Sequence, residues 1–157
     1  MKRSSQRGRK RAFTLLELLL VAGILAVLAA FALPALYGRA TAAKIDITKA
    51  EIGRNGPIAK SLEAFRFDVG RYPETSEGLE ALFKAPSGLD DEEEGQWKGP
   101  YLEGTPDELR DAWNHEYEYK CPGDVNEESF DLWSRGPDGK EDGGKESSDD
   151  IKNWRDK

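Results

Sequence analysis

A single carboxylate, that of Glu17, lies near the start of the apolar run Phe13–Tyr37. An ionised carboxylate within hydrocarbon costs about 2.5–3.5 kcal/mol on the most lenient insertion scale, so such a group is normally retained where a partner neutralises it. The chemistry that this residue offers is therefore an ion pair formed in apolar surroundings. An ordinary membrane anchor would leave Glu17 unexplained.

The element that positions Glu17 is long enough to cross a bilayer. At about 1.5 Å per residue, Leu18–Leu33 covers roughly 24 Å and Phe13–Tyr37 roughly 37 Å, against a hydrocarbon core of about 30 Å. Basic residues crowd the N-terminal side of the run, namely Lys2, Arg3, Arg7, Arg9, Lys10 and Arg11. Such a leader keeps its end in the cytoplasm, so we expect the rest of the chain on the other side of the membrane.

A secretory signal peptide has a similar basic head, but it fits the run poorly. Its apolar core is about 7–15 residues long and ends in a cleavage motif of small residues. Here the run is longer and continues into Tyr37, Gly38 and Arg39. We therefore favour a retained membrane segment over a secretory signal.

The residues Arg11 to Glu17 read Arg-Ala-Phe-Thr-Leu-Leu-Glu and precede an apolar helix that contains Pro34. They resemble the class III signal of type IV pilins and pseudopilins. In that family a dedicated peptidase cuts on the cytoplasmic face just before the Phe, and the new amino terminus is methylated. The resemblance implies cleavage between Ala12 and Phe13 with N-methylation of Phe13, although members usually carry Gly where this chain has Ala12.

The resemblance also implies a partner for Glu17. This acid becomes the fifth residue of the processed chain, and in these filaments it is taken to pair with the N-terminal ammonium of a neighbouring subunit in the apolar filament core. Deleting one member of a buried pair should cost several kcal/mol, because the surviving charge stays desolvated. We therefore expect Glu17 to act in assembly.

The composition leaves room for one spanning helix and one small outside domain, since the chain has 157 residues of which 38% are apolar. The net charge is −7, from 23 basic and 30 acidic residues, and the leader holds six of the bases. So acidic an outside domain argues against a nucleic-acid partner, which requires Lys and Arg on the phosphates. It suits divalent cations or basic partners.

Residue types typical of catalysis are scarce. His115 is the sole histidine, and no serine or cysteine nucleophile motif accompanies it. Cys121 is the sole cysteine, so an intramolecular disulfide, a zinc site or a redox pair is not expected. We predict no enzyme, and a small domain without a disulfide needs another staple, for which a metal is the obvious candidate.

The segment 38–69 is predicted to extend the stem out of the membrane, because its apolar residues recur at spacings near three and four. These residues are Ala42, Ile45, Ile47, Ile52, Ile58, Leu62 and Phe65. Gly53, Asn55, Gly56 and Pro57 interrupt the pattern. The helix either kinks near 53–57 or stops and restarts with Asn55 near a cap and Pro57 in the first turn, and we favour the restart.

The stretch Phe67–Leu82 resembles the major pseudopilin family of type II secretion. There it ends the long helix, turns through an Arg-Tyr-Pro corner and starts a short helix whose Leu residues pack onto the stem. The residues agree, since Gly70 and Pro73 stop a helix, and Thr75 or Ser76 before Glu77 predicts a capped new one. Packing alone is the expected role of this stretch.

The remaining chain is predicted to form a small antiparallel sheet from Pro100–Glu103, His115–Lys120 and Ser129–Ser134. The acidic run Asp90–Glu94 is predicted to be a solvated surface loop that holds no metal. The fold class is thus α+β, a type IV pilin-like fold with a transmembrane helical stem packed on a three-stranded sheet. Its parts are a cleaved leader, 1–12, a transmembrane part, 13–37, a soluble stem, 38–69, and a periplasmic head, 70–157.

The C-terminal segments Ser134–Lys140 and Ser148–Trp154 resemble the family's calcium loop. Calcium takes six to eight oxygen ligands from carboxylates and carbonyls. The resemblance implies side-chain ligation by Asp138, Asp149 and Asp150 and backbone ligation by Arg135 and Lys140, whose cationic side chains should point away. The loop is longer than the family's, and an added acid could replace an expected ligand, namely Glu141, Asp142 or Glu146.

This loop has two alternative interpretations. An EF-hand beginning at Asp138 is rejected, because Lys140 fills a ligand position and no helices flank the loop. A solvated acidic tail without calcium stays open.

The resemblance implies a structural subunit, the major pseudopilin, that polymerises into a periplasmic pseudopilus and drives export of folded proteins across the outer membrane. The implied partners are further copies of the chain, minor pseudopilins, the inner-membrane assembly platform and the prepilin peptidase. The chain would cross the inner membrane once, with a cytoplasmic N-terminus and a periplasmic C-terminal domain. The alternatives are a membrane-anchored calcium-binding envelope protein that never polymerises, a minor pseudopilin and a type IV pilin subunit.

Overall fold

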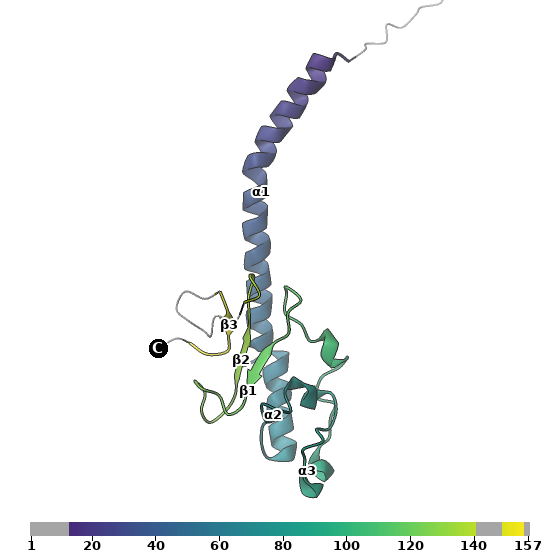
Figure 1. Ribbon diagram of the computed structural model, residues 1–157, viewed down its shortest axis with the longest axis vertical. Coiled ribbons are helices and arrows are strands. Elements are labelled where there is room, and N and C mark those ends of the chain that lie inside the picture. Colours follow the sequence, from purple (N-terminus) through teal and green to yellow (C-terminus); the bar gives the residue numbers. More distant parts are fainter. Residues whose placement is uncertain (1–12, 141–148, 156–157) are drawn as a thin grey trace, which may run out of the picture. The chain divides into compact units, whose positions relative to one another are not determined.

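The computed structural model describes residues 13–140 and 149–155. The chain divides into two compact units, one ending at Ala40 and the other beginning at Thr41, and the boundary falls inside the first helix. Figure 1 labels the elements along the chain. In order they are α1 (Leu15–Ile52), α2 (Pro57–Val69), the 3-10 helix η1 (Leu79–Leu82), α3 (Asp91–Gln96), the 3-10 helix η2 (Pro106–Glu108), β1 (Glu118–Lys120), β2 (Asp131–Ser134) and β3 (Ile151–Lys152).

The N-terminal unit consists of the apolar part of α1, in which Pro34 lies inside the helix. Its large apolar side chains, among them Leu16, Ile24 and Phe31, are exposed. Among the described residues, one helical stretch, within Leu15–Val69, is long and apolar enough to cross a membrane. An apolar helix with no protein packed on it requires lipid or other helices around it.

The stem is interrupted between Ile52 and Pro57, and the predicted restart is confirmed. Pro57 is the first residue of α2, where its missing N–H costs no hydrogen bond. The cap is Gly56 and not the expected Asn55. A Cβ on Gly56 would lie 2.2 Å from the carbonyl oxygen of Glu51, so the close approach of the two helices excludes any side chain there.

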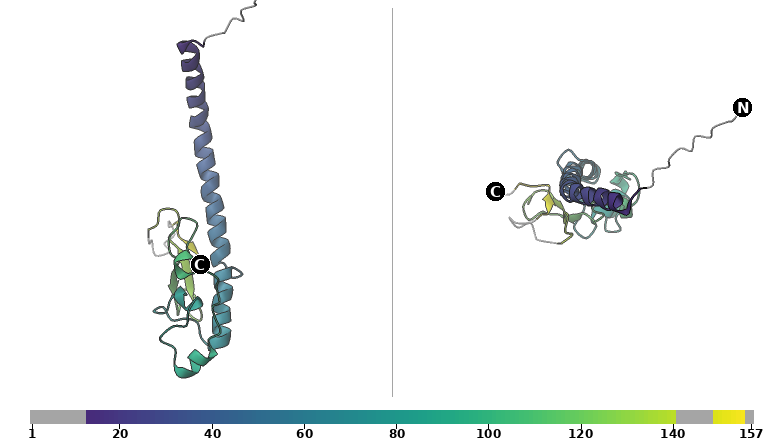
Figure 2. Two further views of the ribbon diagram at one scale, coloured as in Figure 1. Left: turned by 90° about the vertical axis from the view of Figure 1, so that its right-hand side faces the viewer. Right: turned by 90° about the horizontal axis from the view of Figure 1, so that it is seen from above.

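The core of the second unit forms where α2 meets the sheet, and Figure 2 shows these elements from two further sides. Helix α2 buries Ile58, Leu62 and Phe65, and the sheet contributes Leu132 and Ile151. The hydroxyl of Tyr117 donates to the carboxylate of Glu51, which ties the approach to the sheet to the last turn of α1. Helix α2 ends at Gly70, whose φ of 90° is the left-handed conformation that favours glycine.

The described residues form an antiparallel sheet in the order β1-β2-β3, with Glu118 opposite Trp133 and Trp133 opposite Lys152. Two of the predicted strands are confirmed in shorter form. The predicted strand Pro100–Glu103 is wrong: the amides of Tyr101 and Leu102 both donate to the carbonyl of Leu82, which leaves no strand partner.

The third strand is Ile151–Lys152, which the sequence placed inside the calcium loop. Two residues are too few to show a strand's alternation in the sequence.

The acidic run is a helix and not the predicted loop. Asp90 caps α3: its carboxylate accepts from the amides of Glu92 and Glu93, and the Glu93 carboxylate accepts from the Asp90 amide. Carboxylates are stabilised at the positive end of a helix, so an unbroken acidic run can begin one.

The predicted cap of the next helix is also wrong, because η1 follows Gly78 without a side-chain cap. The Thr75 hydroxyl bonds instead to the backbone of Cys121.

Candidate functional site

Glu17 lies in the first turn of α1. Its amide donates to the hydroxyl of Thr14 at 3.2 Å, so Thr14 caps the helix just before the acid. The carboxylate of Glu17 thus lies at the positive end of the helix, where a negative charge is stabilised. Ala12, on one side of the expected cleavage point, lies outside the described residues, and Phe13 precedes the helix with its side chain exposed.

Glu17 has no ion pair with any of the residues that the structure describes. The apolar side chains around it on α1, including Leu16 and Leu20, are exposed. An acid in such surroundings needs a cation from outside this helix once water is removed. The geometry therefore leaves Glu17 available to a neighbouring chain.

The second candidate site is the loop that follows β2. Gly136 has a φ of 62°, and a Cβ on it would lie 2.2 Å from the carbonyl oxygen of Asp149. The amide of Asp138 donates to the carboxylate of Asp149 at 3.2 Å. The structure thus brings together two of the three acids that the sequence singled out, through a close backbone approach that only glycine permits.

Lys140 does not point away from the loop as expected. Its amide donates to the Asp138 carboxylate at 2.8 Å, and its ammonium lies 3.2 Å from the other oxygen of the same carboxylate. These two hydrogen bonds lower the pKa of the Asp138 carboxyl. The guanidinium of Arg135, in contrast, pairs with Glu118 on β1.

A buried acid that the sequence reasoning missed holds the start of this loop. Asp111, 5% exposed, accepts a hydrogen bond of 2.5 Å from the Ser134 hydroxyl, which in turn accepts from the Gly136 amide at 3.0 Å. The other carboxylate oxygen accepts from the amides of Trp113 and His115. An Asp whose carboxylate bonds amides two and four residues later is an Asx-type turn, so Asp111-Ala112-Trp113 was the available signal.

His115 packs on the other end of the loop. A Cβ on Gly139 would lie 2.9 Å from the ring nitrogen Nε2 of His115. The other ring nitrogen of His115, Nδ1, lies 3.5 Å from the Asp111 carboxylate. The sole histidine therefore serves the packing of the loop against the segment before β1.

The donor chemistry of the loop fits calcium, which prefers carboxylate and carbonyl oxygens. Asp138 and Asp149 lie one hydrogen bond apart, and Asp150 is only 8% exposed. Within 13–140 and 149–155, no three His, Cys, Asp or Glu side chains gather into a group that could hold a metal. The ligand set therefore stays a prediction, and the added acids Glu141, Asp142 and Glu146 lie outside the described residues.

The Arg-Tyr-Pro corner of the second unit holds a cluster of charged side chains. The Arg71 guanidinium binds the Glu77 carboxylate through two nitrogens at 2.7 and 2.9 Å and the Glu93 carboxylate at 2.7 and 3.3 Å. It also donates to the Tyr72 carbonyl at 3.1 Å. Hydrogen bonds from Arg71 lower the pKa of the Glu77 and Glu93 carboxyls.

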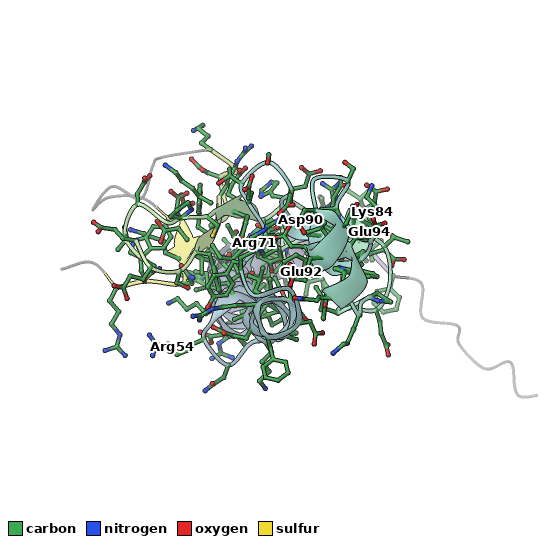
Figure 3. All side chains as sticks on the ribbon, turned by 90° about the horizontal axis from the view of Figure 1, so that it is seen from below. Arg54, Arg71, Lys84, Asp90, Glu92 and Glu94 are labelled. Carbon is green, nitrogen blue, oxygen red and sulfur yellow. The ribbon has the colours of Figure 1, made fainter. Side chains whose placement is uncertain are left out.

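Figure 3, which looks at this end of the molecule, shows Arg71 close to the start of α3 at Asp90. The cluster therefore fixes α3 to the corner after α2.

Two known protein families match this chain, one at its N-terminal end and one over the remainder. Residues 7–33 match the prokaryotic N-terminal methylation motif. Residues 35–154 match the family described as type II secretion system, protein G.

Curated relatives match over nearly their whole length. The type II secretion system core protein G of Pseudomonas aeruginosa is 39% identical over 150 residues, which cover 95% of this chain and 98% of that protein. The protein of the same name from Vibrio cholerae is 35% identical over 146 residues, which cover 93% of this chain and 92% of that protein.

Among solved structures, the chain is similar to the crystal structure of the major pseudopilin from the type 2 secretion system of enterohaemorrhagic Escherichia coli. The TM-score is 0.57 at 29% identity, covering 76% of this chain and 89% of that chain.

Proposed function

Because this chain belongs to the type II secretion system protein G family, we propose that it is a major pseudopilin, the structural subunit of a pseudopilus. The observation that carries the proposal is the family match from residue 35 to 154 together with the methylation motif at 7–33. The apolar part of α1, exposed on all sides, is the surface that a polymer or a membrane must cover. The family is one of structural secretion-system subunits and not of enzymes.

The subunit crosses the inner membrane once before assembly, with its leader in the cytoplasm and the unit that begins at Thr41 in the periplasm. The basic leader supports this orientation, because positive residues flanking a span stay on the cytoplasmic side. The prepilin peptidase cuts between Ala12 and Phe13, and Phe13 is then methylated. Minor pseudopilins and the inner-membrane assembly platform are the other partners, and growth of the filament exports folded proteins across the outer membrane.

Glu17 carries the assembly step. When a new subunit leaves the bilayer for the filament core, its amino terminus at Phe13 is a cation and the Glu17 of an adjoining subunit is an anion. Pairing lets each charge neutralise the other inside the apolar core, whereas either one alone would stay desolvated without a partner. The exposed position of Glu17 in the first turn of α1 supports this role.

Calcium binds at the loop after β2, with Asp138, Asp149 and Asp150 as side-chain ligands and the carbonyls of Arg135 and Lys140 completing the set. The bound ion would neutralise carboxylates that otherwise repel one another. The Lys140 ammonium must leave Asp138 for that carboxylate to bind a cation. The hydrogen bond from the Ser134 hydroxyl to the buried carboxylate of Asp111 holds the start of the loop in place.

The test of the proposed function follows the native chain in a cell that produces a type II assembly apparatus. Mass spectrometry should find a chain that begins at N-methylated Phe13, and electron microscopy should find filaments when the chain is overproduced. An uncut monomer would contradict the proposal and favour a calcium-binding envelope protein that does not polymerise.

A further inference from the structure

The part of the stem that belongs to the second unit carries exposed basic residues. Lys49 in α1, Arg54 in the turn and Lys60 in α2 are exposed, and we call these three the basic stem surface. None of the acids that the structure describes pairs with them. Most of the chain's 30 acidic residues lie after residue 69, so the charges of the second unit are segregated.

Helix α2 extends this surface with an apolar side chain. The face that holds Ile58, Leu62 and Phe65 is buried in the core. Phe67 lies seven residues after Lys60 and so on the same outer face, and its side chain is 87% exposed. An exposed phenyl ring on the same helix face as Lys60 favours a partner that supplies both contact area and negative charge.

Helix α3 carries the complementary charges. Its carboxylates Asp91, Glu92 and Glu94 are exposed, whereas Glu93 is bound to Arg71, and we call the three free acids the acidic tip. Lys84, which is also labelled in Figure 3, pairs through its ammonium with Glu80 at 2.9 Å. The bond between Arg71 and Glu93 holds the acidic tip in a fixed direction.

Within the described residues, no ion pair joins the two surfaces. Figure 3 shows Arg54 on one side of the head and Glu92 and Glu94 on the other. A contact between two different surfaces of identical chains is heterologous, and it repeats from copy to copy into a filament when the rotation does not close a ring. Opposite charges on such surfaces also set the register and exclude wrong contacts.

We infer that the basic stem surface, with Phe67, is an interface that receives the acidic tip of another copy of this chain. The inference rests on the proposed polymerisation and names the surfaces that make it. Because both surfaces are rigidly mounted, the contact is made between folded heads and adds to the pairing of the apolar helices.

The experiment measures filament yield of the full chain in cells that hold the assembly apparatus. Arg54→Glu with Lys60→Glu should lower the yield at least about fivefold, because like charges would then face each other in every contact. Glu92→Lys with Glu94→Lys should lower it by a similar factor, and the four changes together should restore it to within about twofold of wild type. Lys120→Glu with Arg155→Glu, the same change of net charge outside both surfaces, is the matched control and should leave the yield unchanged.

Thermal melting of each purified variant by near-ultraviolet circular dichroism separates assembly from folding, and Phe67→Ser gives a second route that changes no charge. The inference is overturned if the stem variant, folded as wild type is, assembles normally, or if the combined variant is no better than its parents. A wild-type chain that is processed but never polymerises would instead overturn the proposed function itself.

Discussion

Arg71→Ala tests the reasoning about the corner most sharply, because one side chain holds two carboxylates. Glu77 is the decisive partner, since its side chain is only 8% exposed and Arg71 is 28% exposed. Removing one member of a buried ion pair costs about 3–5 kcal/mol of stability. Because Arg71 is partly exposed, water can solvate part of the carboxylate that is left, so we expect the free energy of unfolding to fall by about 2–3 kcal/mol. For a unit of this size the melting temperature should fall by about 10 °C.

The assay is thermal unfolding of the full chain in detergent micelles, followed by near-ultraviolet circular dichroism of the tryptophans. Lys84→Ala is the matched control. Its ammonium also pairs with a glutamate, Glu80, at 2.9 Å, but the two side chains are 70% and 61% exposed. A pair in that setting contributes less than about 0.5 kcal/mol. The melting temperature of Arg71→Lys should lie between those of Arg71→Ala and Lys84→Ala, because an ammonium keeps the charge but loses the bidentate hydrogen bonds.

The same pair predicts a pH dependence with a definite sign. Arg71 lowers the pKa of Glu77 below its ordinary value of 4.5, so the folded chain holds the ionised form more tightly than the unfolded chain does. The stabilisation is therefore present above that ordinary pKa and is lost as the pH falls through the lowered one. The difference in melting temperature between wild type and Arg71→Ala should therefore become smaller as the pH falls through that range. Equal melting temperatures for Arg71→Ala and Lys84→Ala at neutral pH would refute the reasoning.

Three further changes test the other sites. Glu17→Leu should leave cleavage before Phe13 intact by mass spectrometry and reduce filaments at least about tenfold, because the neighbouring ammonium would be buried alone; normal filaments would remove the argument. Calcium at a hundredfold excess over its Kd should stabilise the chain by about 2.7 kcal/mol. Asp149→Asn should abolish that gain, whereas the control variant Asp124→Asn should respond to calcium as wild type does. Gly56→Ala should cost about 2–3 kcal/mol in urea unfolding through overpacking, whereas Gly95→Ala, with nothing within 4 Å of the new Cβ, should not destabilise; equal effects would contradict the close approach at Gly56.

The break in the stem shows how far local signals reach. Pro57 cannot lie inside a helix without losing a hydrogen bond, so the restart was readable from the sequence. The identity of the cap was not, because Gly56 is required by the carbonyl of Glu51 across the turn and not by its own backbone angles. Asn55 is the better cap by residue type alone.

The C-terminal loop shows the opposite balance. The resemblance pointed to Asp138 and Asp149 as neighbours, and the amide of Asp138 does bond the Asp149 carboxylate. Asp111 was not predicted as a site residue, because its importance comes from Ser134, a residue that only the sheet brings to it. Lys140 was also assigned the wrong direction, because the ammonium finds the nearest carboxylate, that of Asp138.

The sequence alone was enough to predict the membrane-spanning run, its orientation and the role of the acid within it, because each prediction depends on composition and order along one helix and on the cost of charge in hydrocarbon. It also determined where helices stop, since glycine and proline act through their own backbone. Only the tertiary structure decided that Arg71 binds Glu93 and so fixes α3 to the corner, and that the third strand is Ile151–Lys152. Those outcomes depend on partners distant in sequence, whose hydrogen bonds outweigh the weak local preference of a short segment.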